Sequence, residues 1–348
     1  MSARQPSAPF VFFVLFLVYI TWGSTYIGYK LTLEVCGPFF AAGARSFAGG
    51  VLLACWLVLR GQWRRPSLPA ARRLAGFGVP MVVMASGLLA VGQTQVPSSV
   101  AAVLTSSCPI IMILAGWLFA GEPRLAPLQC LGLVAGSVAI ARLGFQQAGS
   151  GGEHSALGCL AVVVAAAGWV AGSLAMKKRP LEDAVPPLEA TCLLLLSGGL
   201  EALLLGLLFG EHNRLHWDHL HPAVAIAFAW MTVGGSIIAY AAYMWLLTHV
   251  RLAVAVSYEY VVPVVGIFLG WLLGGERVTL GVVAACAAAV GAVFLVVTRR
   301  TGDVGPFRHA GTLARWRRKR TMHVQTLGPG IAGKDVGKDV GKGAGRPS

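Results

Sequence analysis

VPSSVAAVLTSSCPIIMILAGWLFAGE, residues 96–122, is echoed 154 positions later by VRLAVAVSYEYVVPVVGIFLGWLLGGE, residues 250–276. Ten positions of the two stretches are identical, and one of them pairs Pro109 with Pro263. Both stretches are long and apolar, and each ends on a Gly-Glu pair. The chain therefore contains an internal duplication, and its two halves are expected to fold alike.

The composition excludes a soluble globular domain. The chain has 348 residues, of which 56% are hydrophobic and 12% charged, and its mean hydropathy is +0.70. A soluble domain carries about 25% charged residues, and a helix needs about 20 mostly apolar residues to cross a membrane. We predict an all-α integral membrane protein with ten transmembrane helices, centred on residues 10–29, 38–59, 74–94, 98–120, 126–146, 156–176, 187–209, 221–247, 252–274 and 279–298.

Five predicted spans fall in each half, and an odd number of spans inserts the second half upside down. We therefore expect a first five-helix repeat over 1–147, an inverted second repeat over 155–298, and a tail over 299–348. Inverted repeats that enclose a site near the middle of the membrane are a recurring architecture of secondary transporters. Transport is the leading functional hypothesis on this ground alone.

The basic residues predict the orientation. With the N-terminus in the cytoplasm, 23 of the 28 Lys and Arg residues fall on the cytoplasmic side and four on the opposite side. Lys and Arg are retained on the cytoplasmic side, so both termini are expected there. The tail carries 12 basic residues against 3 Asp, which accounts for most of the net charge of +14.

The tail itself is expected to be disordered, because it is rich in Gly and charge. Its basic segment, residues 315–320, either acts as a solvated topology signal or touches anionic lipid headgroups or a partner. A nucleic-acid partner is not expected. No cleavable signal peptide is expected, since the first apolar run continues through residues 10–29. The seven cysteines are scattered without paired spacing, so neither disulfides, a metal site nor a cofactor is predicted.

Pro109 and Pro263 lie inside matched spans, where a proline removes a backbone hydrogen bond and kinks the helix. Backbone groups freed in this way are tolerated in a membrane only beside protein or a water-filled cavity. Matched breaks therefore point to a substrate site with two hinges; the alternative is a pair of packing kinks. Polar candidates for the cavity precede both prolines: Thr105, Ser106, Ser257, Tyr258 and Glu259.

Ionisable residues within predicted spans are costly and usually face a cavity or a partner. Glu259 is interpreted as a proton-coupling or cation-binding group, or else as a neutral or paired structural carboxyl group. Arg45 either contacts an anionic substrate or has a structural role, capping carbonyls or pairing a buried carboxylate. Further polar and aromatic candidates, which either line the cavity or pack, are Trp22 with its sequence echo Trp169, and Ser24, Thr25, Tyr26, Gln93, Tyr240 and Tyr243.

The sequence resembles the drug/metabolite transporter superfamily in its ten-helix EamA-type branch. The resemblance rests on WGSTYIGYK at 22–30, GARSF at 43–47, VPSSVAAVLTSSCP at 96–109, GSIIAYAAYMWL at 235–246 and SYEYVVPVVGIFLGWLLGGE at 257–276. It implies two inverted five-helix halves, a central cavity and alternating access, as in bacterial inner-membrane exporters of amino acids and other metabolites. A carboxylate at position 259 departs from these relatives, in which the residue is small or apolar, and favours cationic or zwitterionic cargo.

We therefore expect a multi-pass exporter of small molecules, such as amino acids, related compounds or drugs, in a bacterial inner membrane, with protons as the coupling ion. A facilitative uptake carrier or exchanger is the alternative. A membrane-embedded enzyme is disfavoured, because no HExxH motif, nucleophile–base pair or phosphate-binding loop is found. His212, His216 and His219 have a metal-like spacing but are expected in a solvated loop. The sequence leaves the oligomeric state open.

Overall fold

A computed structural model describes residues 6–96, 101, 104–105, 108–120, 127, 130–132, 134–135, 137–139, 142, 156–178, 185–274, 284, 287 and 291. Where it is described, the chain is helical and contains no strand. The chain divides into two units, Met1–Arg299 and Arg300–Ser348, and the described residues all belong to the first. The predicted tail thus lies outside the described residues.

Within the described residues, six helices are long and apolar enough to cross a membrane. Three of them belong to the first half of the chain. They are α1 (Ala8–Gly23) running into α2 (Thr25–Thr32), α3 (Pro38–Leu59), and α4 (Leu68–Gly78) continuing through η1 (Val79–Leu88) into α5 (Leu89–Gln93). The other three are α9 (Ala156–Lys178), α10 (Pro187–Leu208), and α11 (Pro222–Trp230) continuing through η4 (Met231–Ile238) into α12 (Ala239–His249). The predicted helical membrane fold is confirmed at this level.

Two further apolar helices, α7 (Cys108–Ala120) and α14 (Tyr258–Gly274), are shorter. They coincide with parts of the spans predicted at 98–120 and 252–274. The spans predicted at 126–146 and 279–298 lie largely outside the described residues. The count of ten spans and the inversion of the halves therefore stay predictions.

Prolines and glycines set the helix ends. Pro38, Pro187 and Pro222 begin α3, α10 and α11, where proline is favoured because the first helical N–H has no partner within the helix. Gly61 and Gly210 follow the C-terminal ends of α3 and α10 with φ of 63° and 72°. That left-handed conformation ends helices and suits glycine.

Two spans differ from the uninterrupted α-helices expected at 74–94 and 221–247. Both contain a π-helical segment, η1 and η4, in which hydrogen bonds join residues five apart. With the repeat offset of 154 residues, the two segments overlap, so the departure occurs in both copies. A π-helical turn changes the direction in which the following side chains point, compared with an uninterrupted α-helix. Hydropathy cannot predict this change.

The span expected at 252–274 is also divided. A short helix α13 (Leu252–Ala255) ends before Val256 and Ser257, and α14 begins at Tyr258. Pro263 lies inside α14, whereas Pro109 is the second residue of α7. The hinge function of the two prolines stays a prediction.

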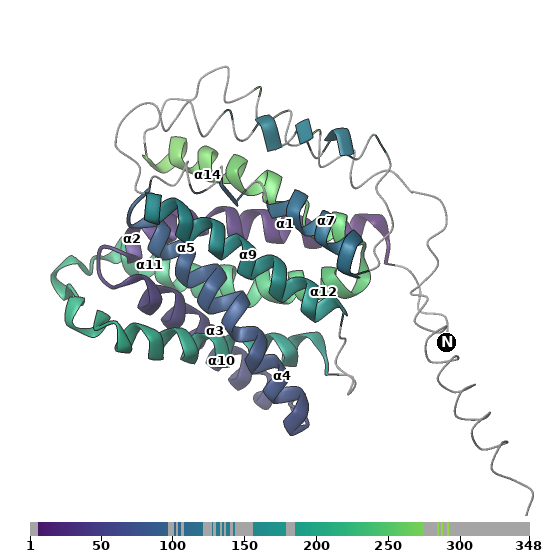
Figure 1. The fold of residues 1–348 in the computed structure, drawn as a ribbon. Coiled ribbons are helices and arrows are strands. Elements are labelled where there is room, and N and C mark those ends of the chain that lie inside the picture. The colour runs from purple at the N-terminus through teal and green to yellow at the C-terminus, as the bar shows by residue number, and fades with distance from the viewer. Residues whose placement is uncertain are drawn as a thin grey trace, which may run out of the picture. The chain divides into compact units, whose positions relative to one another are not determined.

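Helices α3 and α10 pack against each other along their length, and Figure 1 shows them side by side. A Cβ atom on Gly199 would lie 2.4 Å from the backbone N of Phe47, and one on Gly50 would lie 2.8 Å from the backbone N of Leu196. Small residues allow such close approach where lipid provides no hydrophobic drive for helix association. The two helices come from different halves of the sequence.

Two buried carboxylates join the ends of this pair. Glu211 follows α10 in the short helix η2 (Glu211–Arg214) and accepts hydrogen bonds from the backbone N–H groups of Phe39 (3.2 Å) and Phe40 (2.7 Å). Glu189, in the first turn of α10, accepts one from the backbone N–H of Arg64 (2.9 Å), just beyond α3. Helices α3 and α10 are thus antiparallel, and hydrogen bonds join them at both ends. The N-terminus of α3 also favours negative charge.

Candidate functional site

A cavity with a volume of about 100 Å³ lies among the described helices, lined by residues from α1, α2, α3, η1, α5, α7, α9, α12 and α14. One water molecule needs about 10–15 Å³ by the same measure, so the cavity has room for several waters or a small solute. Nine of the residues singled out in the sequence line it: Trp22, Thr25, Tyr26, Arg45, Thr105, Trp169, Tyr240, Tyr258 and Glu259. Both halves of the sequence therefore contribute to one cavity.

Arg45, on α3, is the buried cation of this cavity, with only 3% of its surface exposed. Its Nε donates to the Tyr29 hydroxyl (3.1 Å), one Nη to Ser236 Oγ (3.3 Å) and the other to Ser86 Oγ (3.1 Å). Its guanidinium carbon lies 5.1 Å from the centre of the Tyr29 ring. All of its described hydrogen-bond partners are hydroxyl groups, so Arg45 neither caps carbonyls nor pairs with a carboxylate in the described part of the chain.

Gly235, in η4, lets the cavity wall close around this arginine. Its carbonyl accepts a hydrogen bond from Trp22 Nε1 (3.0 Å). A Cβ atom at this position would lie 2.8 Å from Thr25 Cγ2 and 3.2 Å from an Nη of Arg45. Any larger residue would therefore push either the aromatic wall or the guanidinium out of place.

An aromatic cluster surrounds Trp22. The centre of its ring system lies 5.1 Å from that of Trp169, 4.7 Å from Tyr258, 5.6 Å from Tyr240 and 5.4 Å from Tyr243. Aromatic pairs at these separations add roughly 0.5–1.5 kcal/mol each beyond their burial. The cluster joins helices from both halves of the chain and presents ring surfaces to the cavity.

Trp22 and Trp169, which echo each other in the sequence, differ in their hydrogen bonds. Trp22 Nε1 donates to the Gly235 carbonyl, whereas Trp169 Nε1 is buried and has no hydrogen-bond partner among the described residues. The repeat offset of 154 residues relates Gly235 to Met81, whose carbonyl accepts from the Tyr240 hydroxyl (2.8 Å) instead. The two halves are thus not equivalent at the cavity.

Glu259 lies in the first turn of α14, directly after the break at Val256 and Ser257, and its side chain lines the cavity. The N-terminus of a helix favours a negative charge. Arg45 lines the same cavity from α3, and the two side chains form no ion pair with each other. The cavity therefore presents a cation and a carboxyl group on separate helices.

Other candidates do not line the cavity. Tyr243 belongs to the aromatic cluster but not to the cavity lining, and its hydroxyl donates to Ser173 Oγ (2.9 Å). Ser24 accepts from Trp230 Nε1 (2.7 Å), and the Ser257 hydroxyl lies 3.3 Å from that of Tyr19. Gln93 has a buried amide for which the described ranges hold no hydrogen-bond partner. Ser106 lies outside those ranges.

Three polar residues of the lining were missed: Tyr29, Ser86 and Cys108. Trp22, Thr25, Tyr26 and Tyr29 follow the spacing i, i+3, i+4, i+7, which places residues on one helix face. That spacing would have identified Tyr29. Ser86 lies in π-helical η1 and Cys108 at the start of α7, and neither gave a signal in the sequence.

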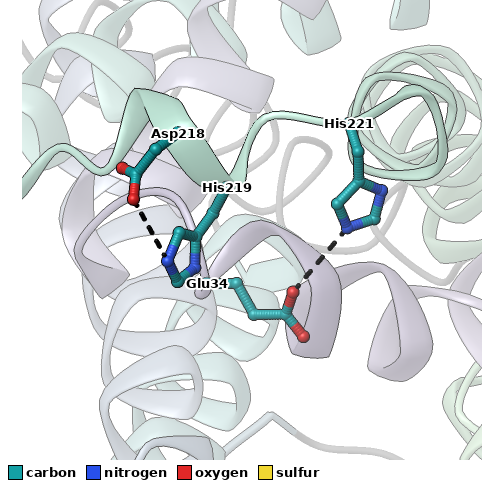
Figure 2. Close-up of polar contacts among 4 residues, drawn as sticks. All are labelled: Glu34, Asp218, His219 and His221. Carbon is teal, nitrogen blue, oxygen red and sulfur yellow. Dashed lines mark ion pairs between the residues drawn. The ribbon is translucent and has the colours of Figure 1, made fainter.

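A second group of polar residues, shown in Figure 2, combines Asp218 and His219 of the short helix η3 (Trp217–His219) and the nearby His221 with Glu34, which follows α2. His219 Nε2 lies 3.4 Å from Asp218 Oδ2, and His221 Nε2 lies 3.9 Å from Glu34 Oε2. Their side chains are about half exposed or more. In the described part of the chain, no three His, Cys, Asp or Glu side chains are placed to hold a metal ion.

Cys36 lies in the turn between α2 and α3. Burial, and then the nearby Glu211 carboxylate, raise the pKa of its thiol to about 11. The thiolate, not the thiol, is the reactive nucleophile. Cys36 is therefore a neutral packing residue at neutral pH.

The match to a known family agrees with this arrangement. The EamA-like transporter family matches residues 9–144 and, a second time, residues 156–298. The chain belongs to the EamA-like transporter family. This EamA-like transporter is 32% identical over 274 residues to the inner membrane transporter YedA of Escherichia coli, covering 77% of this chain and 84% of YedA. It is 24% identical over 303 residues to the transporter YvbV of Bacillus subtilis, covering 85% of this chain and 94% of YvbV.

A protein solved by crystallography shares the fold of this EamA-like transporter. The TM-score is 0.67 at 19% sequence identity, and the match covers 83% of this chain and 96% of the other. The family expected from the sequence is thus confirmed. The EamA-like transporter is a multi-pass membrane protein, and its cavity is the candidate site for a small-molecule substrate.

Proposed function

We propose that this EamA-like transporter exports small metabolites, amino acids or related compounds among them, across the bacterial inner membrane by alternating access. The observation that carries the proposal is the single cavity lined by both halves of the sequence, with Arg45 from the first half and Glu259 from the second. A buried cation without a carboxylate partner is costly in a membrane. Binding of a transported solute would account for its presence on the cavity.

The proposed architecture has ten helices in two inverted repeats, 1–147 and 155–298, with both termini and the basic tail in the cytoplasm. The family match, which occurs once in each half, supports this division. The helix break before Glu259 also supports it, since discontinuous helices form the substrate sites of inverted-repeat transporters. Pro109 and Pro263 act as the hinges.

Glu259 is the proposed coupling group. A carboxyl group on the cavity can bind either a proton or a cationic group of the cargo, but not both. Competition between the two would exchange an entering proton for a leaving solute. The position of Glu259 beside the helix break supports this role, because movement of α14 would change its access to water.

The test starts from a screen of cells that express the transporter for resistance to toxic amino-acid analogues and cationic toxins. Uptake of each hit is then measured in everted membrane vesicles under an imposed pH gradient. We expect uptake in wild-type vesicles that an uncoupler abolishes, and loss of gradient-driven uptake in Glu259→Gln. Glu34→Gln, which changes a half-exposed carboxylate away from the cavity, is the matched control. Full proton-driven uptake by Glu259→Gln would refute the coupling role.

A further inference from the structure

We infer that Lys177 and Lys30 are alternating latches, side chains that hold opposite ends of the transport pathway closed in the two states of the cycle. In the described state the Lys177 latch is engaged and the Lys30 latch is released. The assignment rests on the proposed transport function and its inverted repeats. It adds two positioning residues that lie outside the cavity lining.

Lys177 lies near the C-terminal end of α9 and reaches the C-terminal end of α12. Its Nζ donates to the backbone carbonyls of Leu247 (3.5 Å) and Val250 (3.3 Å). The last carbonyls of a helix have no partner within that helix, and they favour a positive charge. The ammonium group therefore joins α9 to the end of α12, at the end that is cytoplasmic in the proposed topology.

Lys30 occupies the equivalent position in the first half of the chain. An offset of 147 residues relates Trp169 to Trp22 and Lys177 to Lys30. Lys30 is exposed, and its ammonium group has no hydrogen-bond partner in the part of the chain that the structure describes. The two equivalent cations are therefore in different states, one bonded and one not.

The helix end that would receive Lys30 matches the one that Lys177 holds. The offset of 154 residues relates the end of α12 to the end of α5. The Val250 N–H donates to the Leu246 carbonyl (3.0 Å), and at the equivalent positions the Val96 N–H donates to the Gly92 carbonyl (2.9 Å). The end of α5 thus offers Lys30 carbonyls equivalent to those that Lys177 holds on α12.

The cavity differs between the halves in the same sense. Tyr26 and Leu89, which lie beyond the central Trp22 toward the ends of α2 and α5, line it. Their equivalents in the second half are Ser173 and Tyr243, which do not line it. These two are buried and bonded to each other instead, since the Tyr243 hydroxyl donates to Ser173 Oγ (2.9 Å). The cavity therefore extends further toward Lys30 than toward Lys177.

Alternating access explains why equivalent positions would differ in this way. Inverted halves can exchange their conformations, so that the end closed in one state is open in the other. In the opposite state Lys30 would hold the end of α5, and Lys177 would release the end of α12. Each latch then stabilises only one state. A group that contributes to only one of two states shifts their equilibrium, so loss of either latch should favour the state that the other latch holds.

Hydrogen–deuterium exchange of the purified full-length transporter in lipid nanodiscs, without cargo, tests the pair. Lys177→Met keeps an apolar stem and removes the donors. The ratio of the two states should shift by roughly tenfold, the worth of one hydrogen bond to a charged group. Exchange should become faster at residues 243–251, which lose the latch. It should become slower at residues 89–96, which Lys30 would then hold.

Lys30→Met is the second variant, and it changes an exposed side chain, so it should not impair folding. It should slow exchange at the distant residues 243–251, because the state in which they are released becomes rarer. Two controls accompany the variants. Lys177→Arg keeps a charged donor and should behave like the wild type, and Arg214→Met removes an exposed cation of η2 and should change neither segment.

A simple helix cap gives a different result. If Lys177 only stabilises the end of α12, Lys177→Met will speed exchange at residues 243–251 and leave residues 89–96 unchanged, and the inference is overturned. Unchanged exchange at residues 243–251 in Lys30→Met overturns it as well. If these reciprocal effects occur but no export is found, the latches stand and the proposed export fails. If export is found without them, the transporter function stands and the latches fail.

Discussion

At the scale of single residues, the hydroxyl groups around Arg45 decide how the cation is presented. Tyr29→Phe keeps the ring beneath the guanidinium and removes the oxygen that accepts from Nε. A buried donor left without a partner costs about 1–3 kcal/mol. We expect Tyr29→Phe to lower the unfolding free energy by about that amount and to raise the KM for transport, as measured by denaturation in detergent and by vesicle uptake.

Tyr19→Phe is the control for this variant. It also removes a tyrosine hydroxyl that forms a hydrogen bond, but its partner is the Ser257 hydroxyl and not Arg45. It should cost only about 0.5–1.5 kcal/mol, the net worth of an ordinary hydrogen bond, with an unchanged KM. An equal rise in KM for both variants would mean that Tyr29 acts through general destabilisation rather than through Arg45.

The sequence predicts some of the residues that form the site but not the others. Arg45 and Glu259 attract attention because charges are rare in membrane spans, and the structure places both on the cavity. The partners of Arg45 could not be predicted: Ser86 and Ser236 are small hydroxyl residues that are common in spans. Their role depends on the rotation that η1 and η4 impose on the helix, which has no hydropathy signature.

At the scale of helices, hydropathy and proline placement locate α3 and α10 to within a residue or so of the predicted 38–59 and 187–209. The pairing of these two helices could not be predicted in this way, because lipid-facing and protein-facing surfaces are equally apolar. Glycine positions such as Gly199 decide it. The breaks inside the predicted spans 74–94, 221–247 and 252–274 were likewise not visible in composition.

The α3–α10 contact yields a sharp prediction. Gly199→Ala would place a methyl group 2.4 Å from the backbone N of Phe47, so the helices must separate. We expect a loss of about 1–3 kcal/mol, typical of overpacking, measured as a lower midpoint of thermal unfolding. Gly76→Ala, on α4 with nothing within 4 Å of the new atom, should be neutral or stabilising, since alanine favours helix. Equal effects of both changes would contradict the close packing.

At the scale of the whole molecule, the excess of basic residues predicts which segments face the cytoplasm. A reporter fused after Arg300 should be active in the cytoplasm. A cysteine placed at Asp218, after the seventh predicted span, should react with a membrane-impermeant maleimide added to intact cells with a permeabilised outer membrane. Unsubstituted protein controls for the native cysteines. A periplasmic reporter after Arg300 would exclude ten spans with both termini inside.

The duplication is the feature of the whole molecule that the sequence reveals most directly, because the offset of 154 residues can be read without a structure. The family match to both halves agrees with it. The difference between the halves at the cavity could not be read in the same way. Trp22 and Trp169 echo each other in the sequence, yet within the described part of the chain only Trp22 has a hydrogen-bond partner for its ring N–H. Such differences depend on neighbours that an alignment of one half with the other does not contain.

The two glutamates that join α10 to α3 have a consequence for transport. Glu189 and Glu211 form hydrogen bonds at opposite ends of a helix pair drawn from both halves, so we expect α3 and α10 to move together. Arg45 belongs to this pair. Glu259 belongs to α14, which among the described helices packs mainly on α1 and α2. A solute in the cavity would therefore contact both the α3–α10 pair and α14, and its release would remove that link between them.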